Sequence, residues 1–306
     1  MRTLLKILIF IILGEIIFQA HKHWGIEHVN DIADEPAAQI KPDSIPNTIY
    51  LLGDSYTKGL GIAKENRLVN RLNTPGYFVA DNSHSSHNWA DYVSVIRAFE
   101  SEYKKGDYIV IGVNWNDVLF NKGAINYILD KPSRETDTSK AVAKKMRKNT
   151  KPSGLRKHVH TLYRNSAMIS FLSGNIQNTL KRHGIPLPIG DFHYLKEIAY
   201  KEKKDEMDRV MKYLTSVNMK YGTRIILYLM PDFNLTNNIN YFRDFDDFFE
   251  LYNNAPGITI LNGPELFKDS PDGYYCISVH DGHPNDSAHI RIAKDICNEI
   301  ADKYSP

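Results

Sequence analysis

Five short apolar runs recur along this chain, and segments whose apolar residues have helical spacing lie between them. The runs predict buried strands at Thr48–Leu52, Tyr77–Ala80, Asp107–Val113, Arg224–Met230 and Gly257–Leu261. The intervening periodicity predicts helices at Glu65–Leu72, Trp89–Tyr103, Tyr194–Tyr221, Tyr241–Tyr252 and Asp286–Tyr304. This alternation predicts an α/β fold, a doubly wound, flavodoxin-like parallel sheet of about five strands in a three-layer α/β/α sandwich.

The same pattern predicts the domain organisation. Residues 1–20 form a hydrophobic segment, residues 21–47 form a polar tether that contains prolines, and residues 48–306 carry the strands and helices. Between about 124 and 190 the rhythm stops, and many Lys and Arg residues are set against few acids. This predicts a basic helical insertion, which is either a solvated face or a surface for anionic lipid headgroups or an acidic glycan.

The N-terminal segment resembles a targeting sequence. Arg2 and Lys6 precede the run ILIFIILGEIIF at 7–18, so the segment is predicted to be a signal peptide or a signal anchor. We favour an uncleaved anchor, because Phe18 is large where a cleavable signal needs a small residue. The basic flank then places the rest of the chain outside the cytoplasm. Cleavage would make the protein secreted or periplasmic.

Composition and motif content narrow the function classes. The net charge of +2 over 306 residues argues against a dedicated nucleic-acid binder. Cys276 and Cys297 lack metal-site spacing, and we expect buried thiols unless export lets them pair. The sequence has no Walker A motif and no G-x-G-x-x-G after a strand, so no cofactor is expected. It also has no G-x-S-x-G, the nucleophile elbow of α/β-hydrolases.

Polar segments follow the predicted strands where a site could form. Gly53-Asp54-Ser55 follows the first strand, the loop at 82–88 follows the second, and Asn114-Trp115-Asn116-Asp117 follows the third. A further segment, HDGHPN at 280–285, precedes the last helix. Ligands bind at the carboxyl edge of open parallel sheets, so Ser55 is placed to act there. Each segment also has a structural interpretation, as a turn, a loop or a helix cap.

Taken together, these segments resemble the SGNH/GDSL hydrolase family, over most of residues 48–304. Three blocks carry the resemblance, in order: Gly53-Asp54-Ser55 with Thr57, Gly59 and Gly61 after it, Asp107–Asp117, and Asp281-Gly282-His283-Pro284-Asn285 with Ala288 and His289 after it. The resemblance implies that Ser55 is the nucleophile, His283 its general base and Asp281 the orienting acid. It also implies that the Ser55 N–H and the Asn116 amide stabilise the oxyanion.

Three positions depart from the family pattern. The second block usually supplies a glycine as an oxyanion donor, but no glycine lies between Gly76 and Gly106, and Ser86 is the expected occupant. The third block has two registers, of which we prefer Asn116, beside Asp117, with Asn114 as a close competitor. Asp281 and His283 are two positions apart instead of the common three, so a Ser–His dyad helped by a carbonyl is an alternative.

The expected function is a serine esterase that cleaves acyl or acetyl esters of a lipid or glycan through an acyl-enzyme. An O-acyltransferase acting on a cell-envelope glycan with the same triad is the first alternative. An inactive, membrane-tethered glycan-binding domain is another. A metal-dependent hydrolase is a further one, with ligands drawn from His280, His283, His289 and Asp281, and from His84 or His87. The expected partners are an acylated lipid or glycan and, through the N-terminal segment, the membrane.

Overall fold

The computed structural model describes residues 41–118, 120, 123–130, 192–231, 233, 243–271, 273–278 and 281–302. The chain divides into two compact units. One consists of Met1–Glu35 and Met146–Asp191, which lie outside the described residues. The other consists of Pro36–Lys145 and Phe192–Pro306 and contains every element discussed below. The predicted N-terminal anchor and most of the basic insertion therefore lie outside the described residues. No helix within those residues is long and apolar enough to cross a membrane.

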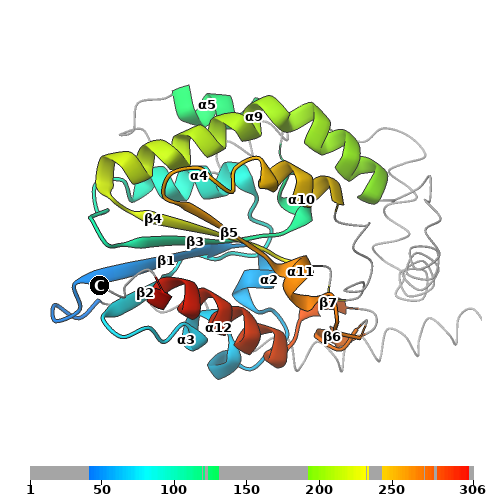
Figure 1. The fold of residues 1–306 in the computed structure, drawn as a ribbon, viewed down its shortest axis with the longest axis horizontal. Coiled ribbons are helices and arrows are strands. Elements are labelled where there is room, and N and C mark those ends of the chain that lie inside the picture. The colour runs from blue at the N-terminus through cyan, green and yellow to red at the C-terminus, as the bar shows by residue number, and fades with distance from the viewer. Residues whose placement is uncertain are drawn as a thin grey trace, which may run out of the picture. The chain divides into compact units, whose positions relative to one another are not determined.

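Five parallel strands form the centre of the described unit. They are β1 (Asn47–Gly53), β2 (Tyr77–Asp81), β3 (Tyr108–Val113), β4 (Arg224–Leu229) and β5 (Ile258–Asn262), in the order β2-β1-β3-β4-β5 (Figure 1). The predicted flavodoxin-like sheet is confirmed. All six residues of β3 are buried, as expected of a parallel strand covered on both faces. Gly53 of β1 pairs with Gly112 of β3, so the chain leaves both strands at nearly the same level.

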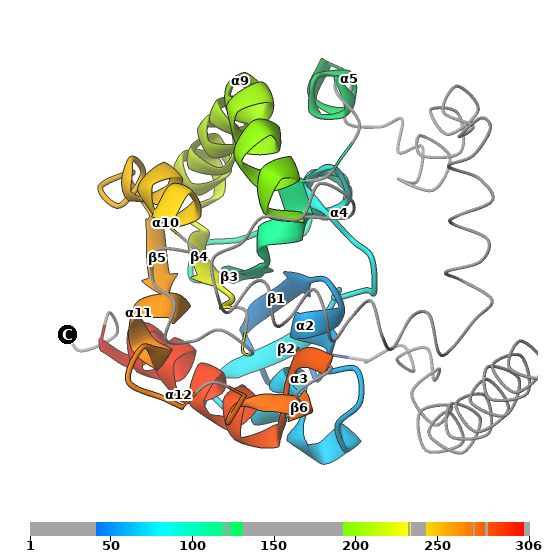
Figure 2. The ribbon, with the colours of Figure 1, turned by 90° about the vertical axis from the view of Figure 1, so that its right-hand side faces the viewer.

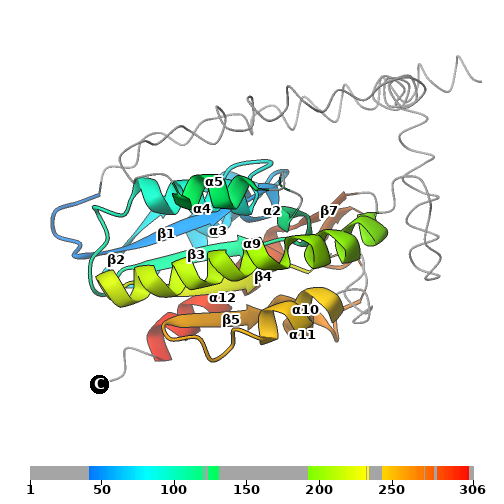
Figure 3. The same ribbon diagram turned by 90° about the horizontal axis from the view of Figure 1, so that it is seen from above.

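Helices cover both faces of this sheet, which confirms the three-layer sandwich. One face carries α4 (Trp89–Ala98), α5 (Ala124–Asp130), α9 (Phe192–Tyr221) and α10 (Arg243–Glu250) (Figures 1 and 2). The other face carries α2 (Ser55–Lys58), α3 (Leu68–Arg71), α11 (Gly263–Phe267) and α12 (Asp286–Asp302). The long helix α9 extends along the strands (Figure 3). On the α12 face, Ile292 and Ile296 pack with Ile49 and Val110 in one apolar cluster.

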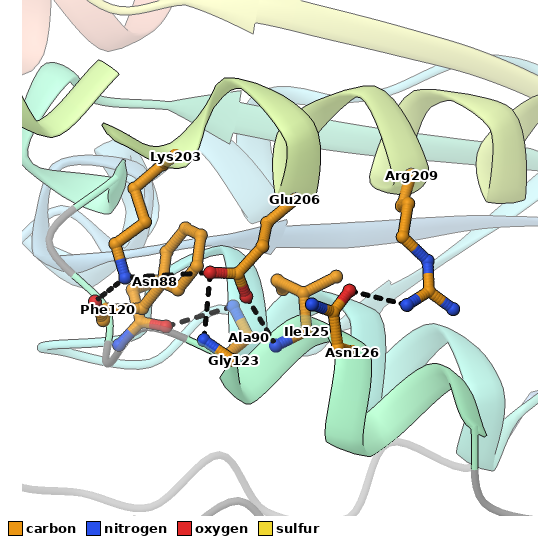
Figure 4. A network of polar contacts seen from close by, with 9 residues as sticks. All are labelled: Asn88, Ala90, Phe120, Gly123, Ile125, Asn126, Lys203, Glu206 and Arg209. Carbon is orange, nitrogen blue, oxygen red and sulfur yellow. Dashed lines mark hydrogen bonds and ion pairs between the residues drawn. The ribbon is translucent and has the colours of Figure 1, made fainter. Parts of the chain in front are cut away.

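A buried polar network fastens α5, where the predicted insertion begins, to α9. Glu206 accepts hydrogen bonds from the N–H groups of Gly123 (2.8 Å) and Ile125 (3.2 Å) at the start of α5 (Figure 4). Lys203 donates to the carbonyl oxygen of Phe120 (2.6 Å) and lies 3.8 Å from Glu206. The carboxylate thus satisfies N–H groups that the first turn of a helix leaves unpaired.

Two helix predictions are wrong in their extent. The helix expected over Glu65–Leu72 breaks at Arg67, whose backbone is extended (φ −63°, ψ 150°), into a 3-10 turn η2 (Lys64–Asn66) and α3. The reason is a tertiary contact, because the Leu68 N–H donates to Nδ1 of His289 (2.9 Å). The helix from Trp89 ends at Ala98, and Tyr103 instead packs its ring edge-on against Tyr50.

The expected polar loop before the last helix contains a hairpin. β6 (Cys276–Ser278) pairs antiparallel with β7 (Asp281–Pro284), so His283 lies on a strand. Cys276 and Cys297 do not form a disulfide. The thiol of Cys276 donates to the Gly273 carbonyl (3.1 Å), and the Thr74 hydroxyl donates to Sγ of Cys297 (3.3 Å).

Candidate active site

The turn after β1 places Ser55 at the carboxyl edge of the sheet. A Cβ on Gly53 would lie 2.0 Å from Oγ1 of Thr57, so only glycine fits where the chain turns. Oδ1 of Asp54 accepts a hydrogen bond from the Tyr56 N–H (2.9 Å) and so caps α2. Ser55 becomes the first residue of α2 and is half-buried. Figure 2 looks onto this edge, where β7, the strand of His283, packs against α2.

Ser55 meets His283 at this edge. Nε2 of His283 lies 2.9 Å from Oγ of Ser55, within the range for proton transfer between a nucleophile and its base. The Tyr56 ring lies against the imidazole, with the two ring centres 4.6 Å apart. This contact was not predictable from the sequence, because Tyr56 follows Ser55 in the turn and belongs to no periodic pattern.

The hairpin that carries His283 is fixed on two sides. Nδ2 of Asn285 donates to the carbonyl oxygens of Tyr274 (2.9 Å) and Cys276 (3.2 Å), while its Oδ1 accepts from the Ala288 N–H (3.1 Å) at the start of α12. On the other side, a Cβ on Gly61 would lie 2.4 Å from Cδ1 of Ile277. The glycine therefore lets β6 pack directly on the loop that follows α2.

Asp281 lies on β7, two residues before His283. Its side chain lies outside what the structure describes. Its role as the orienting acid therefore stays a prediction, as does the alternative of a Ser–His dyad.

The loop after β2 brings Ser86 towards the same edge. Its path is fixed by hydrogen bonds from the N–H groups of Asn82 to the Leu51 carbonyl (2.7 Å) and of His84 to the Gly53 carbonyl (2.9 Å). Ser86 has a φ of 67°, a left-handed conformation that favours glycine. Ser86 thus has a backbone conformation suited to the glycine that is usual in this block. Neither the Ser55 nor the Ser86 N–H donates to another described residue.

Both candidate amides lie directly after β3. Asn114 is fully buried, and neither its Oδ1 nor its Nδ2 has a hydrogen-bond partner in the described part of the chain. Asn116 is half-buried in the 3-10 turn η3 (Trp115–Val118), and its Oδ1 has no partner there either. Buried polar atoms without partners are uncommon in native proteins. Both residues lie at the same edge of the sheet as Ser55, because Gly53 of β1 pairs with Gly112 of β3.

Two buried carboxyl groups lie behind the serine. Burial raises the pKa of Asp54 to about 6, although the Tyr56 N–H and the nearby His283 oppose this increase. Burial, and then the proximity of Asp54, hold the pKa of Asp117 well above its usual value. Oδ2 of Asp117 accepts hydrogen bonds from the Asn114 N–H (2.7 Å) and the Tyr92 hydroxyl (2.9 Å). The sequence pattern predicted only that Tyr92 belongs to the apolar face of a helix, so its hydrogen bond to Asp117 was not predicted.

The described histidines of the metal hypothesis, His84, His87, His283 and His289, do not converge. His283 contacts Ser55, while Nδ1 of the fully buried His289 accepts the Leu68 N–H, and burial lowers the pKa of His289 to about 4. His84 and His87 stack on each other, with their ring centres 4.9 Å apart. The described residues contain no group of three or more His, Cys, Asp or Glu side chains that could hold a metal ion, and His280 lies outside them.

Comparison with known proteins gives likenesses of fold. No family model matches the chain, and no curated protein matches it. One similar solved structure is a member of the lipolytic protein G-D-S-L family from Veillonella parvula, which is 10% identical, with 85% of this chain and 98% of that chain covered and a TM-score of 0.41. Another is the lipase Lip_vut3 from a goat rumen metagenome, which is 12% identical, with 82% and 96% covered and a TM-score of 0.44. The strand order of this chain is that of the flavodoxin-like parallel sheet that the sequence predicted.

Proposed function

We propose that this chain is a serine ester hydrolase of the SGNH/GDSL type. One observation carries the proposal, the 2.9 Å contact between Oγ of Ser55 and Nε2 of His283 at the carboxyl edge of the sheet. A free serine hydroxyl is a weak nucleophile, and a base in hydrogen-bond contact activates it by taking its proton during attack. Residues that are distant in sequence meet here where ligands of such sheets bind.

The reaction follows from this pair. Oγ of Ser55 attacks the ester carbonyl carbon while Nε2 of His283 takes the hydroxyl proton, and the carbonyl electron pair moves onto the oxygen. The tetrahedral intermediate collapses, and His283 gives the proton to the departing alkoxide oxygen. The products of this half are a free alcohol and an acyl ester of Ser55. Water then attacks this ester, His283 takes a proton from it, and the acid leaves as the proton returns to Oγ.

The oxyanion of each intermediate needs donors at the same edge. The backbone N–H groups of Ser55 and Ser86 are candidates, because neither donates to another described residue. A side-chain amide from Asn116 or Asn114 supplies the third donor. Losing one such donor typically costs about a hundred- to a thousand-fold in kcat. In this proposal Asp281 holds the imidazole in its reactive tautomer.

The substrate class follows from the expected location of the domain. The N-terminal segment, with Arg2 and Lys6 before an apolar run, supports a domain held outside the cytoplasm, where acylated lipids and glycans are accessible. If so, the full chain sediments with membranes, and deletion of residues 1–20 releases it into the soluble fraction. Full-length protein in the soluble fraction would contradict this location and leave the esterase proposal untouched.

Hydrolysis of p-nitrophenyl acetate by the full chain tests the reaction. Ser55→Ala is expected to abolish turnover above the uncatalysed rate, whereas Ser101→Ala, at an exposed turn, is expected to leave it unchanged. Undiminished hydrolysis by Ser55→Ala would refute the proposal. Adding an acceptor glycan distinguishes the two fates of the acyl group, because a transferase would form acylated glycan in place of acetate.

A further inference from the structure

The His283 imidazole contacts an aromatic ring as well as the Ser55 hydroxyl. The Tyr56 ring lies against it, with the two ring centres 4.6 Å apart and the ring planes inclined by 36°. Aromatic pairs in proteins favour ring centres about 4.5–7 Å apart, so this pair is at the close end of that range. Both side chains are half-buried, so the contact is partly removed from water.

The turn that carries Ser55 also fixes the position of Tyr56. Tyr56 is the second residue of α2, and its N–H donates to Oδ1 of Asp54 (2.9 Å). Its side chain packs against the apolar cluster of the α12 face, and α2 itself packs against β7, the strand of His283. The Tyr56 ring therefore links the helix of the nucleophile to the strand of the base.

The contact gains strength when His283 becomes charged. In the proposed reaction the imidazole takes a proton first from Ser55 and then from water, so an imidazolium forms in both halves. The face of an aromatic ring attracts a cation whose distance from the ring centre is within about 6 Å, and more strongly where water is partly excluded. An interaction that is stronger in the transition state than in the resting enzyme raises kcat.

We propose that Tyr56 is a positioning residue of this reaction, whose ring holds the His283 imidazole against Ser55 and stabilises the imidazolium that forms during proton transfer. The inference rests on the proposed esterase function. The ring makes the contact, so the Tyr56 hydroxyl is not required. This role is separate from that of Asp281, which is proposed to act at the other nitrogen of the imidazole.

The values of kcat and KM for p-nitrophenyl acetate test this role. Tyr56→Phe keeps the ring, so its kcat should stay within about threefold of the wild-type value. Tyr56→Leu keeps an apolar side chain without a ring, and its kcat should fall about tenfold, as expected for a partly desolvated cation–π contact. Its KM should change by less than about twofold, because the imidazole is uncharged when the ester binds and both half-reactions slow alike.

Tyr221→Leu is the matched control. Tyr221 is also half-buried, and its ring packs edge-on against Tyr103, with the ring centres 6.0 Å apart. It lies at the end of α9 that leads into β4, so it is at the edge of the sheet opposite Ser55. This variant loses an aromatic contact of the same kind, and it should keep the wild-type kcat and KM.

Thermal unfolding shows which variants fold. If Tyr56→Leu does not fold, Tyr56→Met gives the same comparison, because Met is flexible and has no ring. Full kcat in a folded ringless variant, a loss that lies in KM alone, or a kcat in Tyr56→Phe as low as in Tyr56→Leu would overturn the positioning role alone. Loss of the fold in both ringless variants would assign the ring to stability and would also overturn it. Undiminished hydrolysis by Ser55→Ala would overturn the esterase function, and the positioning role with it.

Discussion

Oγ of Ser55 and Nε2 of His283 lie 2.9 Å apart, on a turn and a hairpin separated by most of the chain. Two glycines make this contact sterically possible. Gly53 leaves room for Thr57 beneath the turn, and Gly61 leaves room for Ile277 of the hairpin. The contact between Ser55 and His283 therefore depends on the lack of a side chain at both glycines as well as on the two reacting side chains.

Asp54 should contribute a decrease in the stability of the protein as pH rises from about 4 to about 6, whereas the lowered pKa of His289 contributes an increase over much the same range. The native carboxyl keeps its proton up to a pKa of about 6, while the unfolded one loses it near pH 4. The native state thus binds more protons in this window, and its free energy of unfolding decreases as pH rises.

Asp54→Asn should remove this decrease, which amounts to about 3 kcal/mol for a shift of this size. Urea unfolding from pH 4 to pH 7 measures it. Asp43→Asn, at an exposed position, is the control and should follow the wild-type curve. If Asp54→Asn follows that curve too, burial of Asp54 does not raise its pKa.

Ser86→Gly should be tolerated. At a φ of 67° a residue with a Cβ is strained by about 1–2 kcal/mol, and glycine relieves this strain at an entropic cost of about 0.5–1 kcal/mol. The free energy of unfolding should therefore stay the same or rise slightly. Because the N–H donor is kept, kcat should stay within about threefold.

Ser86→Val is the matched variant for this position. A β-branched residue fits a left-handed backbone poorly, so the loop should shift and kcat should fall by about a hundredfold through the lost donor. Equal kcat values for the glycine and valine variants would remove Ser86 from the oxyanion hole.

Asn114 and Asn116 should differ in their importance. Asn116→Ala is expected to lower kcat by about a hundred- to a thousand-fold, the usual cost of one oxyanion donor, because Asn116 is half-buried whereas Asn114 is fully buried. Asn114→Ala should cost less than about tenfold. Steady-state kinetics with p-nitrophenyl acetate measures both, and thermal unfolding checks that both variants fold. The reverse order would make Asn114, the competitor of Asn116 in the sequence, the donor.

Glu206→Ala should destabilise the protein strongly. The Glu206 side chain is 7% exposed, and the Lys203 side chain beside it is 8% exposed. Without the carboxylate, Lys203 keeps the Phe120 carbonyl but loses its ion pair, and two N–H groups at the start of α5 lose their acceptor. Breaking a buried pair in this way costs about 3–5 kcal/mol. Chemical denaturation measures the loss. Lys204→Ala breaks the exposed pair with Asp208 on the same helix and should change stability little. A similarly small change in Glu206→Ala would show that the network does not anchor α5.

The sequence predicted the sheet well because its strands are buried on both faces. A run such as YIVIGV at β3 is buried on both faces and therefore apolar throughout, which makes the strand easy to identify. The block order likewise placed Ser55 and His283 at one edge.

Contacts between distant segments were not predictable from local patterns. His289 interrupts the helix expected over Glu65–Leu72, and Tyr92 donates to Asp117 from the apolar face of a helix. The different burial of Asn114 and Asn116 was also not predictable, because the repeated Asn-x-Asn spacing does not reveal it.

Covalent labelling tests the central claim most directly. An alkyl fluorophosphonate reacts with a serine only when a neighbouring base activates the hydroxyl, and mass spectrometry of the digested protein locates the adduct. The proposed site predicts one adduct, on Ser55, in the wild type, and its loss in His283→Ala. An unlabelled Ser55 in folded wild-type protein, or equal labelling in His283→Ala, would contradict a serine nucleophile activated by His283.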